Sequence, residues 1–321
     1  MQLAVALAIV GACALALLVT GLQARDFSAS NGLDACLGDL TGNPRCQFAL
    51  NRFVQRFGTL PAYASYASFL GLLIATFIGA PLIAREIEQG TFRLVWSQGT
   101  PRGRWLFMKL WPLVLGAALA GAIQGLAFLW WWGNFTAVGR PRLDIWYFDV
   151  QGIAPIGFAV FALAVGVAAG AFVQRTIAAM VIAAGAFVAV RFVVASFARE
   201  HYMAPRTETR AFFDSPQARD GWIILQEVRD RDGRKVEVLN CRGLSPEECQ
   251  QSLGLSAHIE YHPADRFWTF QLIELGLFLV LSGALLAATW WKVRGRGFSL
   301  AWPPFARRMA SAARGLRPAQ G

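Results

Sequence analysis

Long apolar runs alternate with polar segments along this chain. An apolar helix of about twenty residues, rising 1.5 Å per residue, crosses a ~30 Å hydrocarbon core. The runs of this length are Leu3–Leu22, Pro61–Ala84, Trp111–Gly133, Ile153–Val173, Ile177–Phe197 and Trp268–Trp291. The pattern therefore predicts an all-α membrane protein with six transmembrane helices.

The composition supports the same class. Hydrophobic residues make up 55% of the chain and charged residues only 16%, whereas soluble domains carry about 25% charged residues. The net charge of +10 comes mostly from arginines between and after the apolar runs, where basic residues orient a protein in the bilayer. We therefore expect these charges to orient the protein in the lipid bilayer and not to bind a nucleic acid.

Basic residues also predict the topology. They are dense in residues 85–110, after the second run, and in the tail 292–321, and Arg175 separates the fourth and fifth runs. Short cytoplasmic loops are enriched in Lys and Arg, so these segments and both termini are expected in the cytoplasm. The loop 23–60 and the stretch 198–267 then lie outside the cell.

The external stretch 198–267 is expected to form a small α/β insertion between the fifth and sixth helices. Two strand-like segments, 221–228 and 234–239, flank Asp232-Gly233, a pair typical of a tight hairpin turn. Ser245-Pro246 with acidic residues after it predicts the start of a short helix. The resulting division is 1–197 for helices one to five, 198–267 for the insertion, 268–291 for helix six and 292–321 for the tail.

Cysteines form two close pairs outside the apolar runs. Cys36 and Cys46 share one predicted external loop, and Cys241 and Cys249 share the other. Disulfides persist in oxidising compartments. The sequence therefore predicts the pairs Cys36–Cys46 and Cys241–Cys249.

Small residues recur at helical spacing in two of the runs. Gly121 and Gly125 lie four apart in the third run, and Gly166 and Gly170 lie four apart in the fourth. This spacing permits close helix approach in lipid, although it also arises by chance in a chain rich in Gly and Ala.

Residues 84–110, AREIEQGTFRLVWSQGTPRGRWLFMKL, are dense in charge and interrupted by glycines. The order of acidic residues, Gly-Thr, an apolar pair and Thr-Pro-x-x-Arg resembles the cytosolic coupling segment of type-2 ATP-binding cassette (ABC-2) permeases. The runs 79–86 and 261–268 are similar to actinobacterial members. The resemblance assigns the ATPase contact to Arg85, Glu86, Glu88, Gly90, Thr91, Arg93, Pro101 and Arg104.

The resemblance implies a permease subunit, homo- or heterodimeric, in the bacterial plasma membrane, working in export. A separate cytosolic ATPase would bind residues 85–110 and hold the ATP and Mg²⁺, and this chain would need no cofactor or metal. The sequence contains no G-x-x-x-x-G-K-[ST] phosphate loop, which agrees with that division of labour. Members of the family usually begin with a basic amphipathic stretch, whereas Met1 opens on an apolar run, so the start lies upstream or this element is missing.

Arg191 and Glu274 are full charges well inside predicted spans. Each lies six residues from the expected outer end of its span, at Phe197 and Trp268, which puts both roughly 9 Å below the boundary. Unpaired charges are costly at such depth. We therefore expect an ion pair between them, and the alternative is that either charge faces a hydrated pathway.

Other functions have weaker signals. A membrane-embedded enzyme is disfavoured because histidine occurs only at positions 201, 258 and 262, and no Ser/His/Asp set is visible. His258, Glu260 and His262 alternate and could share a strand face, but they do not match H-E-x-x-H, and surface residues are the simpler interpretation. The remaining alternative is a sensor or anchoring protein whose external domain binds a ligand.

Overall fold

A computed structural model describes residues 2–36, 43–60, 62, 65–91, 101–135, 142–211, 221–236 and 254–295. The chain divides into two compact units, each built from separate stretches of sequence. The first unit comprises Met1–Phe69, Leu119–Phe158 and Val190–Leu277, and the second comprises Leu70–Ala118, Ala159–Ala189 and Phe278–Gly321. Residues of both units occur in α7 (Arg102–Gly133), α9 (Ala154–Val173), α10 (Thr176–Val193) and α12 (Phe267–Arg294).

Five helical segments of the described chain are long and apolar enough to cross a membrane. They are Tyr66–Gln89, Arg102–Gly133, Ala154–Val173, Thr176–His201 and Ala264–Arg294. Each overlaps one of the predicted spans, which confirms a mostly helical membrane protein. The first predicted span lies in helix α1, Gln2–Ser30, and the count of six spans stays a prediction.

The helices extend beyond several of the apolar runs. The segment Tyr66–Gln89 continues five residues past Ala84, and α7 begins at Arg102, nine residues before Trp111. Backbone hydrogen bonding continues through polar residues until a stop signal occurs, and Gly90 supplies one with a φ of 74°. Helix therefore covers both ends of the predicted coupling segment, whose residues 92–100 lie outside the described part.

The segment Tyr66–Gln89 changes its helical winding along its length. It runs from η2 (Ser65–Phe69) through α4 (Leu70–Leu73) and a π-helical turn η3 (Ile74–Gly79) into α5 (Ala80–Gln89). Pro81 lies at the start of α5. Proline has no N–H to donate to the carbonyl four residues earlier, and its ring crowds that carbonyl. The wider π turn just before Pro81 accommodates both effects.

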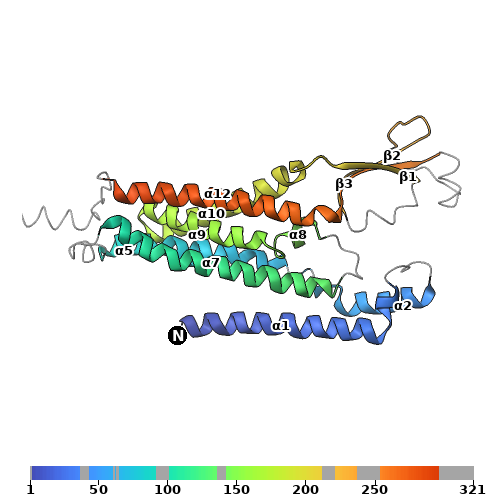
Figure 1. Cartoon of the computed structure of the whole chain (residues 1–321), viewed down its shortest axis with the longest axis horizontal. Helices are drawn as coiled ribbons and strands as arrows, with labels where there is room; N and C mark the ends of the chain where they lie inside the picture. Colours follow the sequence, from blue (N-terminus) through green and yellow to red (C-terminus); the bar gives the residue numbers. More distant parts are fainter. Residues whose placement is uncertain are drawn as a thin grey trace, which may run out of the picture. The chain divides into compact units, whose positions relative to one another are not determined.

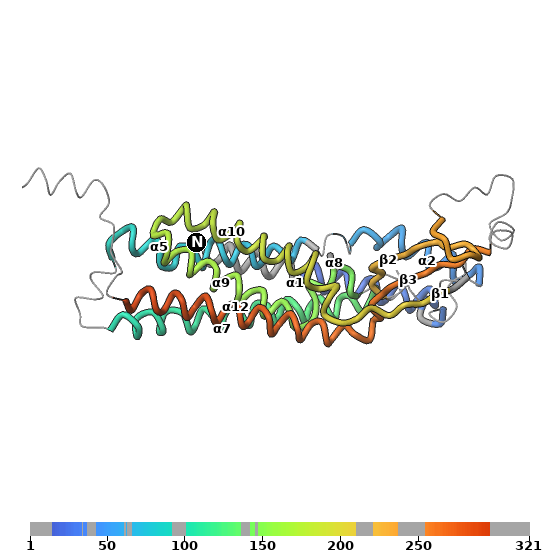
Figure 2. The backbone as a smooth tube through the Cα atoms, turned by 90° about the horizontal axis from the view of Figure 1, so that it is seen from above, coloured from blue at the N-terminus to red at the C-terminus, as the bar shows by residue number. Residues whose placement is uncertain are grey.

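In the second unit, α5 and the preceding π turn pack closely against α9, and the two lie side by side in both views (Figure 1 and Figure 2). A Cβ added at Gly166 would lie 2.7 Å from the Cα of Gly79, and one added at Gly170 would lie 2.5 Å from the carbonyl oxygen of Ala80. Gly166 and Gly170 thus allow the two backbones to touch, as their spacing in the sequence indicates.

In the first unit, an aromatic cluster joins α1, α2 (Pro44–Phe57) and the end of α7, with α2 lying beside the end of α1 (Figure 1). Asn43 caps α2 by accepting a hydrogen bond from the Arg45 N–H, 3.0 Å, and Pro44 suits the first helical position. The buried cluster contains Phe53, Phe57, Phe128, Trp131, Trp132, Phe135 and Tyr147.

A three-stranded antiparallel sheet also belongs to the first unit. Its order is β1 (Arg206–Ala211), β3 (Ser256–His262), β2 (Trp222–Arg229), so the last strand in sequence is central (Figure 1). In β3, Ala257 and Ile259 are buried. This alternation between one buried and one open face is typical of an antiparallel strand with solvent on one side.

The structure has an antiparallel sheet within residues 198–267, in which β2 corresponds to the first predicted strand, 221–228. The second predicted strand, 234–239, is described only as far as Val236. The turn after β2 contains Gly233 with a φ of 76°, and the Val236 N–H donates to the Val228 carbonyl at 2.8 Å, as a hairpin around Asp232-Gly233 requires. Strand β2 also pairs with β3, which the sequence pattern did not indicate. The predicted helix after Ser245 lies outside the described residues, and an external location stays a prediction.

Candidate functional site

The described part of the coupling segment belongs to the second unit and consists of the end of α5 and the start of α7. Gly90 takes the left-handed conformation at the end of α5, and its N–H donates to the Ile87 carbonyl at 3.2 Å. The Thr91 hydroxyl lies 3.4 Å from the Glu86 carbonyl oxygen. The Gly-Thr pair of the motif therefore terminates a helix.

Glu86 forms an ion pair with Lys109 of α7. Glu86 is 33% exposed and Lys109 22%, so water screens the pair only in part. The ammonium of Lys109 also lies 5.1 Å from the centre of the Trp105 ring. Glu86 therefore ties α5 to α7 within the second unit.

Glu88 caps the first turn of α10. One of its carboxylate oxygens accepts hydrogen bonds from the Thr176 N–H at 3.1 Å and from the Thr176 hydroxyl at 2.6 Å. Backbone N–H groups at a helix start have no partner within the helix, and the helix dipole favours a negative charge there. The second acid of the motif thus has an intramolecular role that the sequence did not indicate.

Several predicted ATPase-contact residues are accessible. Arg85, Thr91, Pro101 and Arg104 are exposed, Glu88 remains exposed beside Thr176, and Gly90 is partly buried. Arg93 lies outside the described residues. The exposed charges flanking residues 92–100 therefore include the two guanidinium groups of Arg85 and Arg104 and the carboxylate of Glu88, which is engaged by Thr176.

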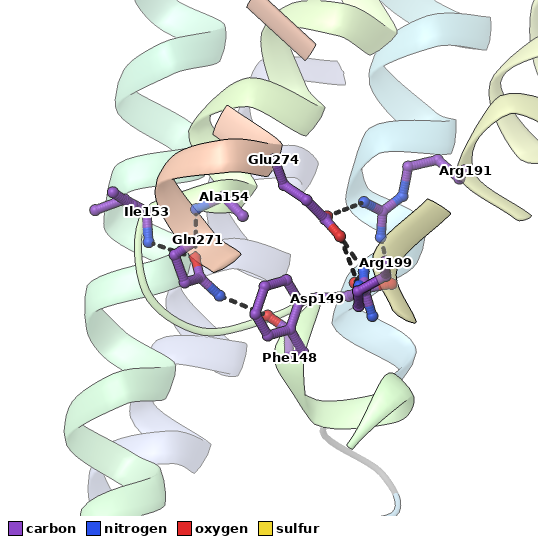
Figure 3. A network of polar contacts seen from close by, with 8 residues as sticks. All are labelled: Phe148, Asp149, Ile153, Ala154, Arg191, Arg199, Gln271 and Glu274. Carbon is purple, nitrogen blue, oxygen red and sulfur yellow. Dashed lines mark hydrogen bonds and ion pairs between the residues drawn. The ribbon is translucent and has the colours of Figure 1, made fainter. Parts of the chain in front are cut away.

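In the first unit, four charged side chains form an ionic network (Figure 3), two of them fully buried and two partly buried. The predicted partners Arg191 and Glu274 are 3.9 Å apart, Nη1 to Oε2. Each has a closer partner that the sequence analysis missed. Arg191 pairs with Asp149, and Glu274 Oε1 accepts from Arg199 Nε at 2.5 Å.

Arg199 is the most enclosed member of the network. Its side chain is fully buried, and its Nη2 donates to Asp149 Oδ1 at 2.5 Å and to Glu274 Oε2 at 3.2 Å. The guanidinium lies 4.3 Å from the centre of the Phe148 ring, and that of Arg191 lies 3.4 Å from the centre of the Phe158 ring. Each arginine therefore meets both carboxylates and one aromatic face.

A π-helical turn explains why both arginines reach the same carboxylates. Arg199 follows Arg191 by eight positions, and the turn η5 (Val194–Ala198) lies between them. In a regular α-helix, residues eight apart differ by about 80° around the axis and residues seven apart by about 20°. A π turn takes up about one extra residue. The two arginines therefore face one side, and such turns are frequent at functional sites.

Gln271 holds the same segment by uncharged contacts, one turn before Glu274 in α12 (Figure 3). Its Oε1 accepts from the N–H groups of Ile153 and Ala154 at 2.9 and 2.6 Å. Its Nε2 donates to the Phe148 carbonyl at 3.1 Å. The amide thus caps the start of α9 and fixes the segment that carries Asp149.

His262, one of the three residues of the weakly indicated metal site, is engaged elsewhere. Arg266 Nη1 lies 2.9 Å from its Nδ1, and its Nε2 lies 3.0 Å from the Glu200 carbonyl oxygen. Since arginine only donates, Nδ1 must accept and Nε2 must carry the proton. Burial lowers the pKa of His262 below its ordinary 6.5. No group of three His, Cys, Asp or Glu side chains among the described residues is placed to hold a metal ion.

Cys36 and Cys46 are joined by a disulfide, with their Cα atoms 5.6 Å apart. The bond connects η1 (Leu33–Cys36), which follows α1, to the first turn of α2. Cys241 and Cys249 lie outside the described residues, and their pairing stays a prediction.

The comparisons with known proteins agree with the helical architecture. The model of one family, ABC-2 membrane transporter related, matches residues 7–199, which is more than half of the chain. No curated protein and no solved structure matches. The matched residues include most of α1, all of α7, α9 and α10, and the described parts of the coupling segment. On this match, the chain belongs to the ABC-2 membrane transporter related family.

Proposed function

We propose that this chain is the membrane-spanning permease subunit of an ABC exporter and that a separate cytosolic ATPase drives it. The family match over residues 7–199 carries the proposal. The five described helices long enough to cross a membrane supply the architecture that a permease requires.

The sequence supports the division of labour between two chains. It contains no G-x-x-x-x-G-K-[ST] phosphate loop, the element that cradles the phosphates of ATP in such ATPases. ATP and Mg²⁺ therefore bind to the partner, and hydrolysis there must be transmitted to this chain through contact.

The contact surface is formed by the residues flanking positions 92–100. Arg85 and Arg104 are exposed there, while Glu86 and Glu88 hold α5 against α7 and α10 through Lys109 and Thr176. The arginines would face an acidic rim on the ATPase, because opposite charges steer association. Glu86 and Glu88 instead stabilise this surface by holding α5 against α7 and α10.

The remaining features of the proposal follow from the family resemblance and the distribution of basic residues. Two permease subunits, identical or different, enclose the translocation path in the bacterial plasma membrane. Both termini and residues 85–110 face the cytoplasm. The three-stranded sheet faces outward, and so does the segment that contains the Cys36–Cys46 disulfide.

The test is co-purification with the ABC ATPase encoded beside this gene. We expect the tagged chain to recover that ATPase from detergent extracts and the complex to hydrolyse ATP, whereas the chain alone does not. The double variant Arg85→Glu/Arg104→Glu should reduce recovery of the ATPase at least tenfold without changing the amount of folded permease. Hydrolysis by the purified chain alone would contradict the proposal.

Two matched variants serve as controls. The variant Arg206→Glu/Arg234→Glu reverses two exposed arginines elsewhere and should bind the ATPase normally. The swap Glu86→Lys/Lys109→Glu preserves a local ion pair and should retain most binding if Glu86 acts within the chain. If the Arg85/Arg104 variant binds normally and the swap does not, the contact surface has been assigned to the wrong residues.

A further inference from the structure

Helix α2 presents an exposed basic face. Arg45, Arg52 and Arg56 are all exposed, and α2 contains no acidic residue. At about 100° per residue, the three arginines lie within a 40° arc, and Phe48 lies about 40° from Arg52. Phe48 is 65% exposed. The outer face of α2 therefore combines three positive charges with one uncovered aromatic ring.

The opposite face of α2 is fixed to the protein. Phe53 and Phe57 are buried, with ring centroids 6.0 and 5.6 Å from that of Phe27 in α1. The disulfide from Cys46 to Cys36 holds the first turn. The basic face is thus presented by a helix that is attached at both ends.

The attachment to α1 sets the depth of α2. Phe27 lies five residues beyond Leu22, the end of the first predicted span, which is about 7.5 Å of helix. The headgroup layer extends roughly 5–8 Å beyond the hydrocarbon core on each side. Phe27 and the rings packed on it are therefore at the level of the lipid headgroups.

Two of the arginines are held at that same level. The guanidinium groups of Arg52 and Arg56 each lie 5.9 Å from the centre of the Phe27 ring, and that of Arg52 lies 5.8 Å from the centre of the Phe48 ring. Both positive charges are consequently at headgroup depth, and Phe48 is positioned to contact the adjoining lipid.

We infer that Arg52 and Arg56, with Phe48 beside them, form a binding site for the headgroup of an anionic phospholipid. Guanidinium groups suit phosphate oxygens because their N–H donors match them in pairs. Zwitterionic lipids carry a compensating positive charge and bind more weakly. This site rests on the predicted first span, from which its depth is counted, and does not depend on the proposed transport function.

The test is native mass spectrometry of the full chain in detergent, titrated with phosphatidylglycerol or phosphatidylcholine. We expect tighter binding of phosphatidylglycerol, and a loss of about 25-fold in Arg52→Gln/Arg56→Gln, because each basic residue contributes roughly fivefold at an anionic surface. The charge-preserving Arg52→Lys/Arg56→Lys should keep the preference for phosphatidylglycerol but lose part of the affinity, because the charge remains while the paired donors are lost. The matched control Arg231→Gln/Arg234→Gln should bind like the wild type.

Equal retention of phosphatidylglycerol by Arg52→Gln/Arg56→Gln and the control would overturn the inference, as would equal affinity of the wild type for the two lipids. Displacement of the lipid by equimolar inorganic phosphate would show a general anion site and exclude a headgroup site. Thermal melting of each variant checks that it is folded. If the glutamine variant is unfolded, the lysine variant decides, since loss of phosphatidylglycerol selectivity there also overturns the assignment.

Discussion

Removal of the Glu274 charge should destabilise the protein strongly. Glu274 is fully buried, accepts two hydrogen bonds from Arg199 and lies 3.9 Å from Arg191. In Glu274→Gln the shape is preserved, but Asp149 alone then faces two guanidinium groups. Breaking one partner out of a buried ionic set costs about 3–5 kcal/mol. We expect a loss of that size in the free energy of unfolding.

A compensating change should recover part of this loss. The double variant Arg199→Met/Glu274→Gln removes one charge of each sign and leaves Arg191 with Asp149. This double variant should lose less free energy of unfolding than Glu274→Gln alone. We expect a coupling energy between Arg199 and Glu274 of roughly 2–3 kcal/mol. The control Asp265→Asn breaks an exposed pair with Arg206 and should cost less than about 1 kcal/mol.

The structure also predicts the outcome of a charge swap. If Arg191 and Glu274 formed an isolated pair, Arg191→Glu/Glu274→Arg would restore much of the stability lost in each single variant. In the network, the new carboxylate would face Asp149 and the new guanidinium would face Arg199. We therefore expect the double swap to be no better than the worse single variant.

The assay is unfolding by SDS in mixed micelles, followed by tryptophan fluorescence and checked by size-exclusion chromatography. Additive losses in Arg199→Met/Glu274→Gln would refute the coupling between these two residues. Rescue by the Arg191/Glu274 swap would refute the four-residue network and favour the isolated pair.

Three further predictions concern other parts of the chain. Reduction of Cys36–Cys46 should lower the free energy of unfolding by about 2–3 kcal/mol in the chain-entropy picture, and maleimide labelling of both thiols without reductant would contradict the bond. Gly166→Ala should cost about 1–3 kcal/mol because its Cβ would meet backbone atoms, whereas Gly185→Ala, with open space around it, should cost nothing; equal effects would refute the close contact. Because burial lowers the pKa of His262, the unfolded state binds more protons below about pH 6.5 and stability should fall as the pH drops; melting curves of His262→Gln should lack this component.

The elements that could be predicted are those determined by the residues of one continuous segment. Apolar runs located spans two to six with end points that differ by up to nine residues, because about twenty apolar residues have one stable arrangement in a bilayer. Helix ends differed because they depend on stop signals such as Gly90 and not on hydropathy. The sheet was only partly predictable. Strand β1 consists mostly of charged and hydroxyl residues and pairs with residues about fifty positions later, which no local pattern reveals.

The same distinction applies to the candidate sites. Counting residues from the span ends placed Arg191 and Glu274 at one depth, and they do lie 3.9 Å apart. Asp149 and Arg199 were missed because both lie just outside the apolar runs. The α-helical period also puts Arg199 about 80° away from Arg191 around the helix axis. The π turn between them removes this angular difference, and no sequence pattern predicted that turn.

The network combines two kinds of attachment within the first unit. Helix α12 holds the segment 148–154 through the uncharged amide of Gln271. The two arginines beside the π turn reach the same segment through charge on Asp149, and Arg199 also contacts the Phe148 ring. Neutral hydrogen bonds fix one geometry, since each donor has one acceptor. In a ring of alternating charges, by contrast, each group keeps an opposite neighbour when one contact is lost. A small shift of the arginines therefore leaves no charge unpaired, which avoids the cost of an isolated charge in an apolar environment.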